Sequence, residues 1–155
     1  MPSRDHHFPC KLTWTGASRG PTTSYDAYDR ALRVDIPGKP SLEASAAPPF
    51  RGDASRHNPE DLLVASLSAC HCLSYLALAA RAGIVVIAYE DDAIGTMAFL
   101  DRKLRFTDVL LRPQVRVRPG ADLAKARSLH EQAHQECFIA NSVNFPVRHE
   151  PTVEE

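Results

Sequence analysis

The spacing of apolar and polar positions changes several times along the chain, and each change marks an expected element. Alternation in "CKLTWTG", residues 10–16, predicts a first strand, and "DAYDRALRVDI", residues 26–36, predicts a second. The residues between these segments are rich in Gly, Ser, Pro and Thr, which favours a turn. We therefore expect the two strands to pair as an N-terminal β-hairpin.

Residues 37–57 interrupt this pattern with four prolines and two glycines. That composition predicts a loop, with a short strand at Ser41–Ser45. Loops of this length in a compact domain are commonly functional, because some interaction must hold them in place. The loop is therefore a candidate source of functional residues.

A long helix is predicted from Pro59 to Arg81. Asn58 is a suitable N-cap, Pro59 suits the first helical position, and Gly83 is typical of the residue just past a helix end. No charged side chain occurs between Asp61 and Arg81. The run is about long enough to cross a membrane, but serines and a histidine interrupt it and no second span accompanies it. We interpret it as a buried core helix.

The next segment predicts a set of strands. Residues 84–100 and 103–119 carry β-branched and alternating residues on either side of a turn at "LDRK". Pro113 lies inside the second of these segments and has no backbone N–H to donate to a neighbouring strand. It is therefore expected at a sheet edge or at a bulge.

A second helix is predicted over residues 120–137, followed by a last strand at 143–147 and a loose tail at 152–155. The order of elements indicates an α+β fold, and the length indicates a single domain over residues 1–155. One face of the second helix gathers Leu123, Ala126, Leu129 or His130, Ala133 and Cys137.

Composition and charge exclude some function classes. The chain has 155 residues, of which 44% are hydrophobic and 24% charged, as is ordinary for a globular protein. Its net charge of −1 gives no electrostatic reason to bind nucleic acid or an anionic membrane. The first ten residues lack the apolar segment of a secretory signal, so a cytoplasmic location is expected.

Four cysteines carry the candidate chemistry: Cys10, Cys70, Cys72 and Cys137. In a reducing compartment a cysteine of note is usually catalytic, redox-active or metal-binding, although a buried free cysteine is most often a packing group. Cys70 and Cys72 are two positions apart on the predicted helix, so they point in nearly opposite directions. We expect one of these two to serve packing only.

The long helix is apolar on every side and therefore needs cover on every side. Pairing with an identical helix across a twofold axis is an economical way to provide it, and we expect a homodimer. The alternative is that the second helix and the long loop cover it within one subunit. Glu60 and Cys70 are about 15 Å apart along the helix axis, so only two antiparallel copies could place both residues in one small site.

A metal site is another possibility. His130, His134 and Cys137 fall at i, i+4 and i+7, on one face of the second helix. Together with Cys70 they could form a tetrahedral zinc site. Histidines at this spacing are more often surface or capping residues, so the metal site stays an alternative.

Two segments resemble a known family. "NPEDLLVASLSACH", residues 58–71, resembles the signature of the osmotically inducible protein C / organic hydroperoxide resistance (OsmC/Ohr) family, in which N-P-E is followed ten residues after the glutamate by a cysteine. "HEQAHQEC", residues 130–137, is similar to the family's second-cysteine segment. The resemblance implies an intertwined homodimer of OsmC-like α+β fold, with an N-terminal sheet and a long central helix. It also implies thiol-dependent reduction of hydroperoxides at the subunit interface.

The resemblance assigns roles to individual residues. Cys70 matches the cysteine that attacks the peroxide, Cys137 the resolving cysteine, and Glu60 the glutamate that holds an arginine. Cys70 lies too far into the helix to use its N-terminus, so a guanidinium is the available means of stabilising a thiolate. Arg51 matches the arginine position of the OsmC branch, and Arg19 that of the hydroperoxide-resistance branch.

These observations predict a cysteine-based hydroperoxide reductase, a peroxidase of the EC 1.11.1 type. We expect its partners to be a hydroperoxide, an external thiol or dithiol reductant and a second copy of the chain. No cofactor, metal, nucleic acid or membrane is expected to take part. The alternatives are a non-enzymatic protein that binds a small ligand in an apolar dimer cleft, and the Cys/His metal protein described above.

Overall fold

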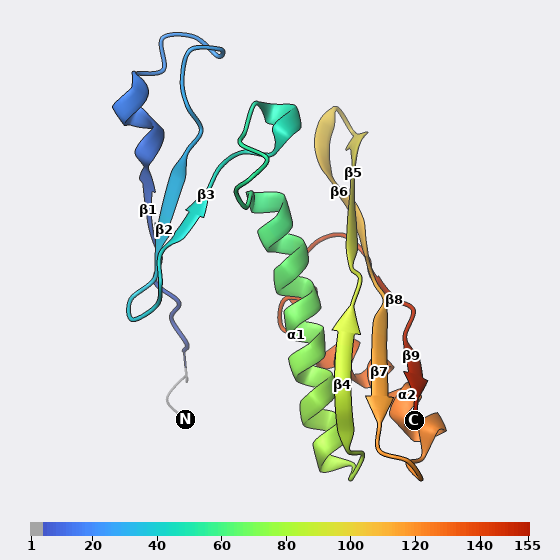
Figure 1. Cartoon of the computed structure of the whole chain (residues 1–155). Helices are drawn as coiled ribbons and strands as arrows, with labels where there is room; N and C mark the ends of the chain where they lie inside the picture. The colour runs from blue at the N-terminus through green and yellow to red at the C-terminus, as the bar shows by residue number, and fades with distance from the viewer. Residues whose placement is uncertain (1–4) are drawn as a thin grey trace. The chain divides into compact units, whose positions relative to one another are not determined.

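The computed structural model describes residues 5–155. These residues fall into two compact units, the first ending at Leu62 and the second comprising Leu63–Glu155. The long helix α1 (Pro59–Arg81) begins in the first unit and continues in the second (Figure 1). Every other helix and strand of the described residues lies within one unit. The single domain predicted for residues 1–155 stays a prediction.

The first unit contains a three-stranded antiparallel sheet and two short 3-10 helices. Its strands are β1 (Lys11–Trp14), β2 (Leu32–Asp35) and β3 (Leu42–Ala44), paired in that order. The 3-10 helix η1 (Thr15–Arg19) follows β1, and η2 (Pro48–Phe50) follows β3. This arrangement confirms the N-terminal hairpin and the short third strand.

The residues before β2 form a loop where a strand was predicted. The Asp29 carboxylate accepts the backbone N–H of Ala31, and the Asp29 carbonyl accepts Trp14 Nε1, both at 2.7 Å. The Arg30 guanidinium lies over the ring of Tyr28, 3.9 Å from its centroid. Side chains that bind the local backbone in this way compete with strand pairing, which explains the late start of β2.

Helix α1 has the limits that its capping residues predicted. The Asn58 side chain accepts the backbone N–H of Asp61 at 2.8 Å, which satisfies one of the free donors at the helix start. The chain leaves the helix through Gly83, whose φ of 74° is a left-handed conformation that glycine adopts without strain. No proline or internal glycine interrupts the helix between these caps.

The second unit contains two three-stranded sheets. In the first, β7 (Pro113–Val117) lies between β4 (Val86–Asp91) and β9 (Thr152–Glu154). β7 pairs antiparallel with β4 and parallel with β9. Pro113 is the first residue of a central strand, so the prediction of an edge or a bulge was wrong. The first residue of a strand is a position that proline tolerates.

The other sheet is built around a long hairpin. β5 (Ile94–Leu100) and β6 (Lys103–Leu111) pair antiparallel, and β8 (Val147–His149) joins β6 in parallel. Asp101 and Arg102 connect the hairpin with φ values of 49° and 62°. Two left-handed residues are characteristic of a tight hairpin turn, which confirms the turn predicted at "LDRK".

The C-terminal segment differs from the prediction. The last strands are β8 and β9, where one strand at 143–147 and a loose tail were predicted. Residues 152–154 are ordered because Val153 is buried, with 5% of its surface exposed, and pairs with Val115 of β7. One buried apolar residue in a short polar tail gives too weak a pattern to predict a strand.

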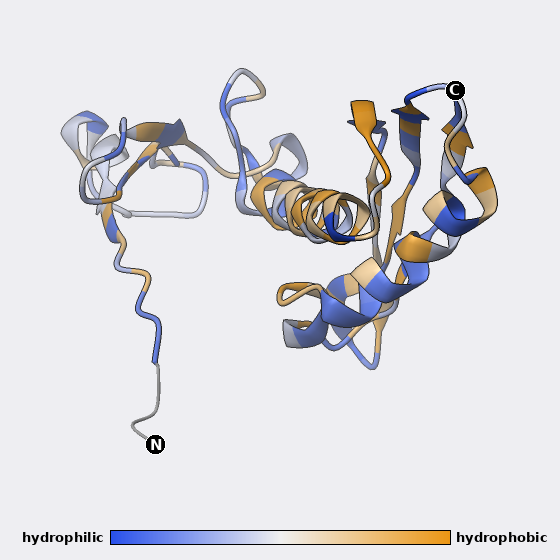
Figure 2. Ribbon diagram, turned by 90° about the horizontal axis from the view of Figure 1, so that it is seen from below, coloured by the Kyte–Doolittle hydropathy of each residue, from blue (hydrophilic) through white to orange (hydrophobic). Residues whose placement is uncertain are grey.

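Two clusters of buried apolar side chains form the core of the second unit. The first joins α1, β7 and α2 (Leu123–Glu136), and Figure 2 shows α2 running across one side of α1. Its main members are Tyr75, Leu78, Ala79, Val115, Val117, Ala126, Leu129 and Ala133. The second cluster comprises Leu67, Val109, Leu111 and Val147. The face predicted for the second helix is therefore the buried one.

Helix α1 is the one helix of the described residues that is long and apolar enough to cross a membrane by length and composition. Figure 2 looks along its axis and shows apolar residues around most of its circumference. Its buried side chains include His71 and Tyr75, and Tyr75 donates a hydrogen bond to the carbonyl of Ala126 at 3.1 Å. A histidine buried against another helix is typical of a protein core, as predicted for this helix.

The buried contact of β9 can be tested by substitution. Val153→Ala should lower the free energy of unfolding by about 2 kcal/mol, because it removes buried methyl groups from the first core cluster. Glu154→Gln, at the exposed neighbouring position, should change it by less than about 0.5 kcal/mol. Urea denaturation of both variants measures this difference. Equal free energies of unfolding for Val153→Ala and the wild type would support the loose tail predicted for residues 152–155 instead.

Candidate functional site

The structure brings Cys70 and Cys137 together within the second unit. Cys70 lies in the middle of α1 and is half-buried, whereas Cys137 follows the last turn of α2 and is 1% exposed. The Cys70 and Cys137 side chains lie close enough for a hydrogen bond between them to act on the pKa of Cys137. The backbone N–H of Ala140 donates to Cys137 Sγ at 3.5 Å. The pair expected from the two motifs is therefore in contact while both cysteines are free thiols.

The environment of Cys137 keeps its proton in place. Burial is the main cause that raises the pKa of the Cys137 thiol, to about 11, and the hydrogen bond with Cys70 raises it further. A thiol that donates a hydrogen bond is favoured in its protonated form. The Ala140 N–H partly offsets this effect, because it stabilises the thiolate. Cys137 is thus a protonated thiol near neutral pH.

Cys70 lines a groove of about 770 Å³ on the surface of the second unit. Leu73 of α1 and Phe138, just past α2, also line the groove, and 68% and 81% of their surfaces are exposed. Glu136 and Arg81 add charge to its lining. Arg81 is eleven residues beyond Cys70, about 16 Å along the helix axis, so it cannot contact the thiol. The groove beside Cys70 is mainly apolar.

One face of α1 is left exposed by the sheet and by α2. Its exposed residues recur every three or four positions along the helix, so they form a continuous stripe. The stripe consists of Ala65, Ala69, Leu73, Ala77 and Ala80. An apolar stripe of this length on an otherwise buried helix indicates an interaction surface.

Cys72 points away from Cys70, toward β4. Burial raises the pKa of Cys72, and the negative charge of Asp91 raises it further. Asp91 is itself occupied, since its carboxylate accepts the Ser68 hydroxyl at 2.5 Å and the backbone N–H of Arg112 at 2.7 Å. These surroundings favour the thiol form and support the packing role expected for Cys72. Cys10 is exposed in the first unit.

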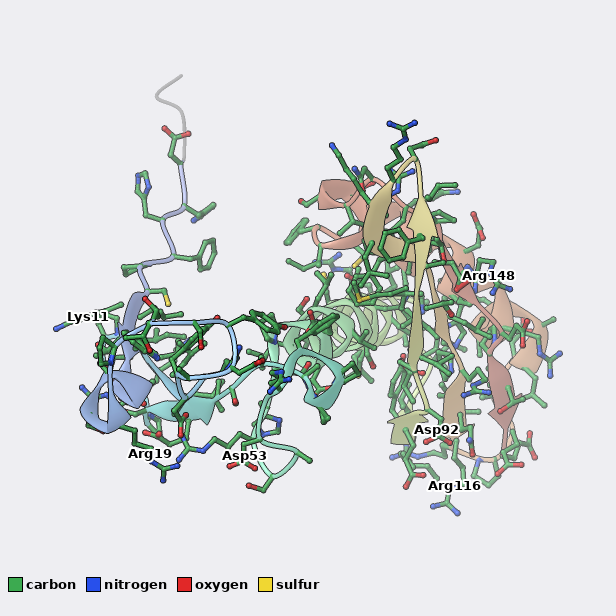
Figure 3. The ribbon with its side chains drawn as sticks, turned by 90° about the horizontal axis from the view of Figure 1, so that it is seen from above. Lys11, Arg19, Asp53, Asp92, Arg116 and Arg148 are labelled. Carbon is green, nitrogen blue, oxygen red and sulfur yellow. The ribbon has the colours of Figure 1, made fainter. Side chains whose placement is uncertain are left out.

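The two candidate arginines lie in the first unit. Arg19 forms an ion pair with Asp29 at 2.8 Å, and Arg51 forms one with Asp26 at 2.9 Å. Both arginines line the same polar cavity of about 540 Å³, as does Asp53, whose side chain lies near Arg19 (Figure 3). The structure thus brings the two alternatives into one cavity.

The backbone around Arg51 is unusually constrained. Arg51 has a φ of 63°, which is uncommon for a residue other than glycine. A Cβ atom on the next residue, Gly52, would lie 1.4 Å from the carbonyl oxygen of Ala46, so only glycine fits there. The loop therefore holds Arg51 in a fixed backbone conformation, as is frequent at functional sites.

Glu60 lies in the first turn of α1 and is half-buried. Its Oε2 atom is buried and has no hydrogen-bond partner among residues 5–155. A buried carboxylate oxygen without a partner is costly, and an arginine is its best partner. Glu60 is therefore available to receive a guanidinium.

A second polar feature joins α1 to α2. His71 Nε2 and His130 Nδ1 form a hydrogen bond of 3.0 Å, and both side chains are almost completely buried. Tyr75 stacks on the ring of His130 at a centroid distance of 3.9 Å. The spacing of apolar residues places His130 near the buried face of α2 but gives no sign that it pairs with His71. Two histidines on separate helices leave no spacing signal in the sequence.

The same contacts bear on the alternative of a metal site. Within the described part of the chain, no group of three or more His, Cys, Asp or Glu residues is arranged to hold a metal ion. His130 turns its Nδ1 atom toward His71, and Cys137 binds Cys70. The spacing of His130, His134 and Cys137 therefore has an explanation in the packing of α2, and the described residues give no support to a zinc site.

Burial keeps both histidines neutral. It is the main cause that lowers the pKa of His71 to about 4 and that of His130 to about 3, and neighbouring imidazoles lower both further. In the neutral pair one ring nitrogen donates and the other accepts, so the contact is a true hydrogen bond. A proton on both rings would turn it into a repulsion.

Acid should therefore weaken the fold through these two rings. Their folded-state pKa values lie below the ordinary 6.5, so the unfolded chain binds more protons and stability falls as pH drops from about 6.5 toward 4. We expect the free energy of unfolding to fall by about 3 to 4 kcal/mol between pH 7 and pH 5 in urea titrations. The double variant His71→Gln/His130→Asn carries no titrating group there and should lose less than half as much. If the free energy of unfolding of the wild type and of the double variant fell equally with pH, the two rings would not be the cause.

Comparison with known proteins places this arrangement in a family. The family described as OsmC-like protein matches residues 52–152, well over half of the chain. The uncharacterized protein YmaD of Bacillus subtilis (strain 168) is 21% identical over 142 residues, which cover 90% of this chain and 87% of that protein.

Solved structures agree with this match. An OsmC-like protein of unknown function from Vibrio cholerae is 32% identical, with a TM-score of 0.87 over 96% of this chain and 100% of that one. An organic hydroperoxide resistance protein from Elizabethkingia anophelis has the same fold, with a TM-score of 0.72 at 20% identity, over 99% of each chain. OhrB, the organic hydroperoxide resistance protein of Bacillus subtilis, has a TM-score of 0.65 at 21% identity, over 94% of this chain and 98% of that one. The resemblance drawn from the two motifs is confirmed, and this chain belongs to the OsmC-like family.

Proposed function

We propose that the protein is a thiol-dependent peroxidase that reduces organic hydroperoxides in defence against oxidative stress. The observation that carries this proposal is the contact between the Cys70 and Cys137 thiols beside an apolar groove. The sharing of a fold with organic hydroperoxide resistance proteins supports it. A pair of free cysteines in contact on two different helices is poised for reversible disulfide chemistry.

The reaction proceeds in three balanced steps. The Cys70 sulfur attacks the O–O bond of the hydroperoxide, so that Cys70 becomes a sulfenic acid and the peroxide leaves as an alcohol after taking up one proton. The Cys137 thiol then attacks the Cys70 sulfur, which forms a disulfide and releases water. An external dithiol finally reduces the disulfide to two thiols and is itself oxidised to a disulfide.

The lining of the groove favours an organic peroxide over hydrogen peroxide. Phe138 exposes a large apolar surface next to Cys70. An alkyl or aryl group bound there gains affinity by leaving water, whereas hydrogen peroxide has no apolar part to bury. The half-buried Cys70 remains within reach of a small substrate, and Cys137 is shielded from it.

An arginine of a second subunit completes the site in this proposal. Cys70 needs a positive charge to stabilise its thiolate, and Arg81 is too distant along the same groove to supply it. Arg51 or Arg19 of the partner copy would supply the guanidinium, and Glu60 would hold it through its unpartnered carboxylate oxygen. The fixed backbone of Arg51 favours it over Arg19, which is 78% exposed.

The exposed stripe on α1 supports a homodimer in which two such helices pack together. Small side chains at Ala65, Ala69 and Ala77 allow close approach of another helix, and Leu73 would be buried between them. An antiparallel pair would bring the start of each helix, with Glu60, toward the middle of the other, with Cys70. No cofactor is required for this chemistry, and a cytoplasmic location would supply the reducing thiols.

Peroxide consumption tests the proposed activity. With dihydrolipoate as reductant, the wild type should consume cumene hydroperoxide, and Cys70→Ser should lose at least about 100-fold in rate because the attacking sulfur is gone. Cys137→Ser should stop after one turnover, with a sulfenic acid that dimedone traps. Cys72→Ser is the matched control and should remain within about threefold of the wild type. In the same assay Arg51→Ala should lose more rate than Arg19→Ala.

Two outcomes of this assay would reject the peroxidase. One is a Cys70→Ser variant as active as the wild type. The other is a wild type that consumes no peroxide, together with a Cys70→Ser variant that still binds an apolar ligand in the groove. The second outcome would establish the alternative of a non-enzymatic ligand-binding protein.

The oligomeric state tests the role of the stripe. Light scattering should give the wild type twice the chain mass of 17.1 kDa, and Leu73→Glu should give a single chain mass, because it places a charge in the buried seam. Ile87→Glu is the control, since Ile87 is equally apolar and exposed but lies on β4, away from the stripe. A monomeric wild type would contradict the dimer.

A further inference from the structure

The hydrogen bond between His71 and His130 joins the same two helices as the cysteine contact. His71 is the residue next to Cys70 on α1, and His130 lies two helical turns before Cys137 on α2. His130 and Cys137 share one face of α2, because seven residues return almost to the same direction. Besides the Tyr75–Ala126 hydrogen bond, a histidine pair and a cysteine pair therefore join α1 to α2.

The histidine contact and the cysteine contact hold α2 at different points along its length. The two contact points are adjacent on α1 but about 10 Å apart along α2, since helical residues rise 1.5 Å each. α2 therefore lies across α1, as Figure 2 shows. The Tyr75–Ala126 hydrogen bond also holds α2 against α1, closer to the N-terminal end of α2. Two contacts separated along its axis fix its direction and hence the position of its C-terminal end.

We propose that His71 and His130 are positioning residues that hold Cys137 against Cys70 through their buried hydrogen bond. The inference rests on the proposed function only in that it concerns the same two cysteines. Neither histidine contacts the peroxide in this role. Their hydrogen bond fixes the middle of α2, so that the thiol just past its C-terminal end meets the Cys70 sulfenic acid and closes the disulfide.

The hydrogen bond between His71 and His130 depends on how α1 and α2 are arranged. His71 Nδ1 and His130 Nε2 have no partner in residues 5–155, so the bond between His71 Nε2 and His130 Nδ1 is the one hydrogen bond that each ring makes there. Breaking it leaves two buried polar groups without partners, which is costly and directional, unlike an apolar contact that tolerates sliding. Tyr75 stacks on His130 and limits rotation of that ring.

Other titratable groups surround the pair. His149 of β8 lies 5.5 Å from His71 between ring centroids, and His134 lies 5.4 Å from His149. The carboxylate of Glu131, on α2, is 3.2 Å from His149 Nε2 and is largely exposed. None of these groups forms a hydrogen bond that joins α1 to α2 in the described residues, so they do not substitute for the pair.

The test measures how readily the disulfide closes, without any peroxide. The reduced protein is equilibrated with reduced and oxidised glutathione at pH 7, and the fraction with a Cys70–Cys137 disulfide gives the effective concentration of one thiol toward the other. His71→Leu and His130→Leu should each lower this effective concentration at least about tenfold. The double variant His71→Gln/His130→Asn should restore it to within about threefold of the wild type, because amide groups replace the two bonded ring nitrogens.

Two controls separate positioning from general stability. Leu78→Ala empties part of the same core on α1 and should lower the free energy of unfolding without changing the effective concentration. His134→Gln changes a histidine one turn from His130 that makes no such bond, and it should also leave the effective concentration unchanged. Unfolding midpoints of all variants confirm that each is folded during the measurement.

The outcomes distinguish this inference from the proposed function. Leucine variants that close the disulfide as readily as the wild type would overturn the positioning role, whether or not the protein consumes peroxide. The positioning role would also be overturned if Leu78→Ala lowered the effective concentration as much as His71→Leu does. A third result is a wild type that consumes no peroxide, together with leucine variants that lower the effective concentration and an amide double variant that restores it. That result would support the positioning role and reject the peroxidase.

Discussion

The absence of charge along α1 is the constraint on which the rest of the structure depends. A helix that carries no charged side chain between Asp61 and Arg81 must be covered, and the second unit covers it with β4 and β7 on one side and α2 across another. The uncovered stripe from Ala65 to Ala80 follows from the same constraint. Because the helix is covered on two sides only, it has a third face to offer to a partner.

The position of the two cysteines follows from this packing. α2 can cover α1 only by crossing it, and its C-terminal end then reaches the middle of α1, where Cys70 lies. The low polarity that shields the sulfurs also makes their ionisation costly, as the raised pKa of Cys137 shows. Apolar surroundings can thus protect a reactive sulfur, but a positive charge from elsewhere is then required to stabilise its thiolate.

Much of the fold could be predicted from local signals. The limits of α1 came from Asn58, Pro59 and Gly83, each of which acts through its own backbone conformation or hydrogen bond. The start of β2 and the ordering of residues 152–154 could not be predicted, because both depend on contacts with distant residues. The Asp29 carbonyl accepts a hydrogen bond from Trp14, fifteen residues away, and Val153 is buried because β9 pairs with the edge of β7.

The candidate site was predictable in part. The two motifs identified Cys70 and Cys137, and the structure confirms that they are neighbours. The histidine pair was not predictable, because the sequence shows two isolated residues whose meaning appears only when α2 crosses α1. The metal alternative gains no support for the same reason, since a spacing on one helix does not reveal which residues face that helix.

The most direct measurement is the mass of the protein after one equivalent of cumene hydroperoxide in the absence of any reductant. Oxidation through the neighbouring thiols predicts a loss of about 2 Da, with the peptides of Cys70 and Cys137 joined by a disulfide. A gain of about 16 Da that persists on Cys70 while Cys137 stays free would contradict it, as would an unchanged mass.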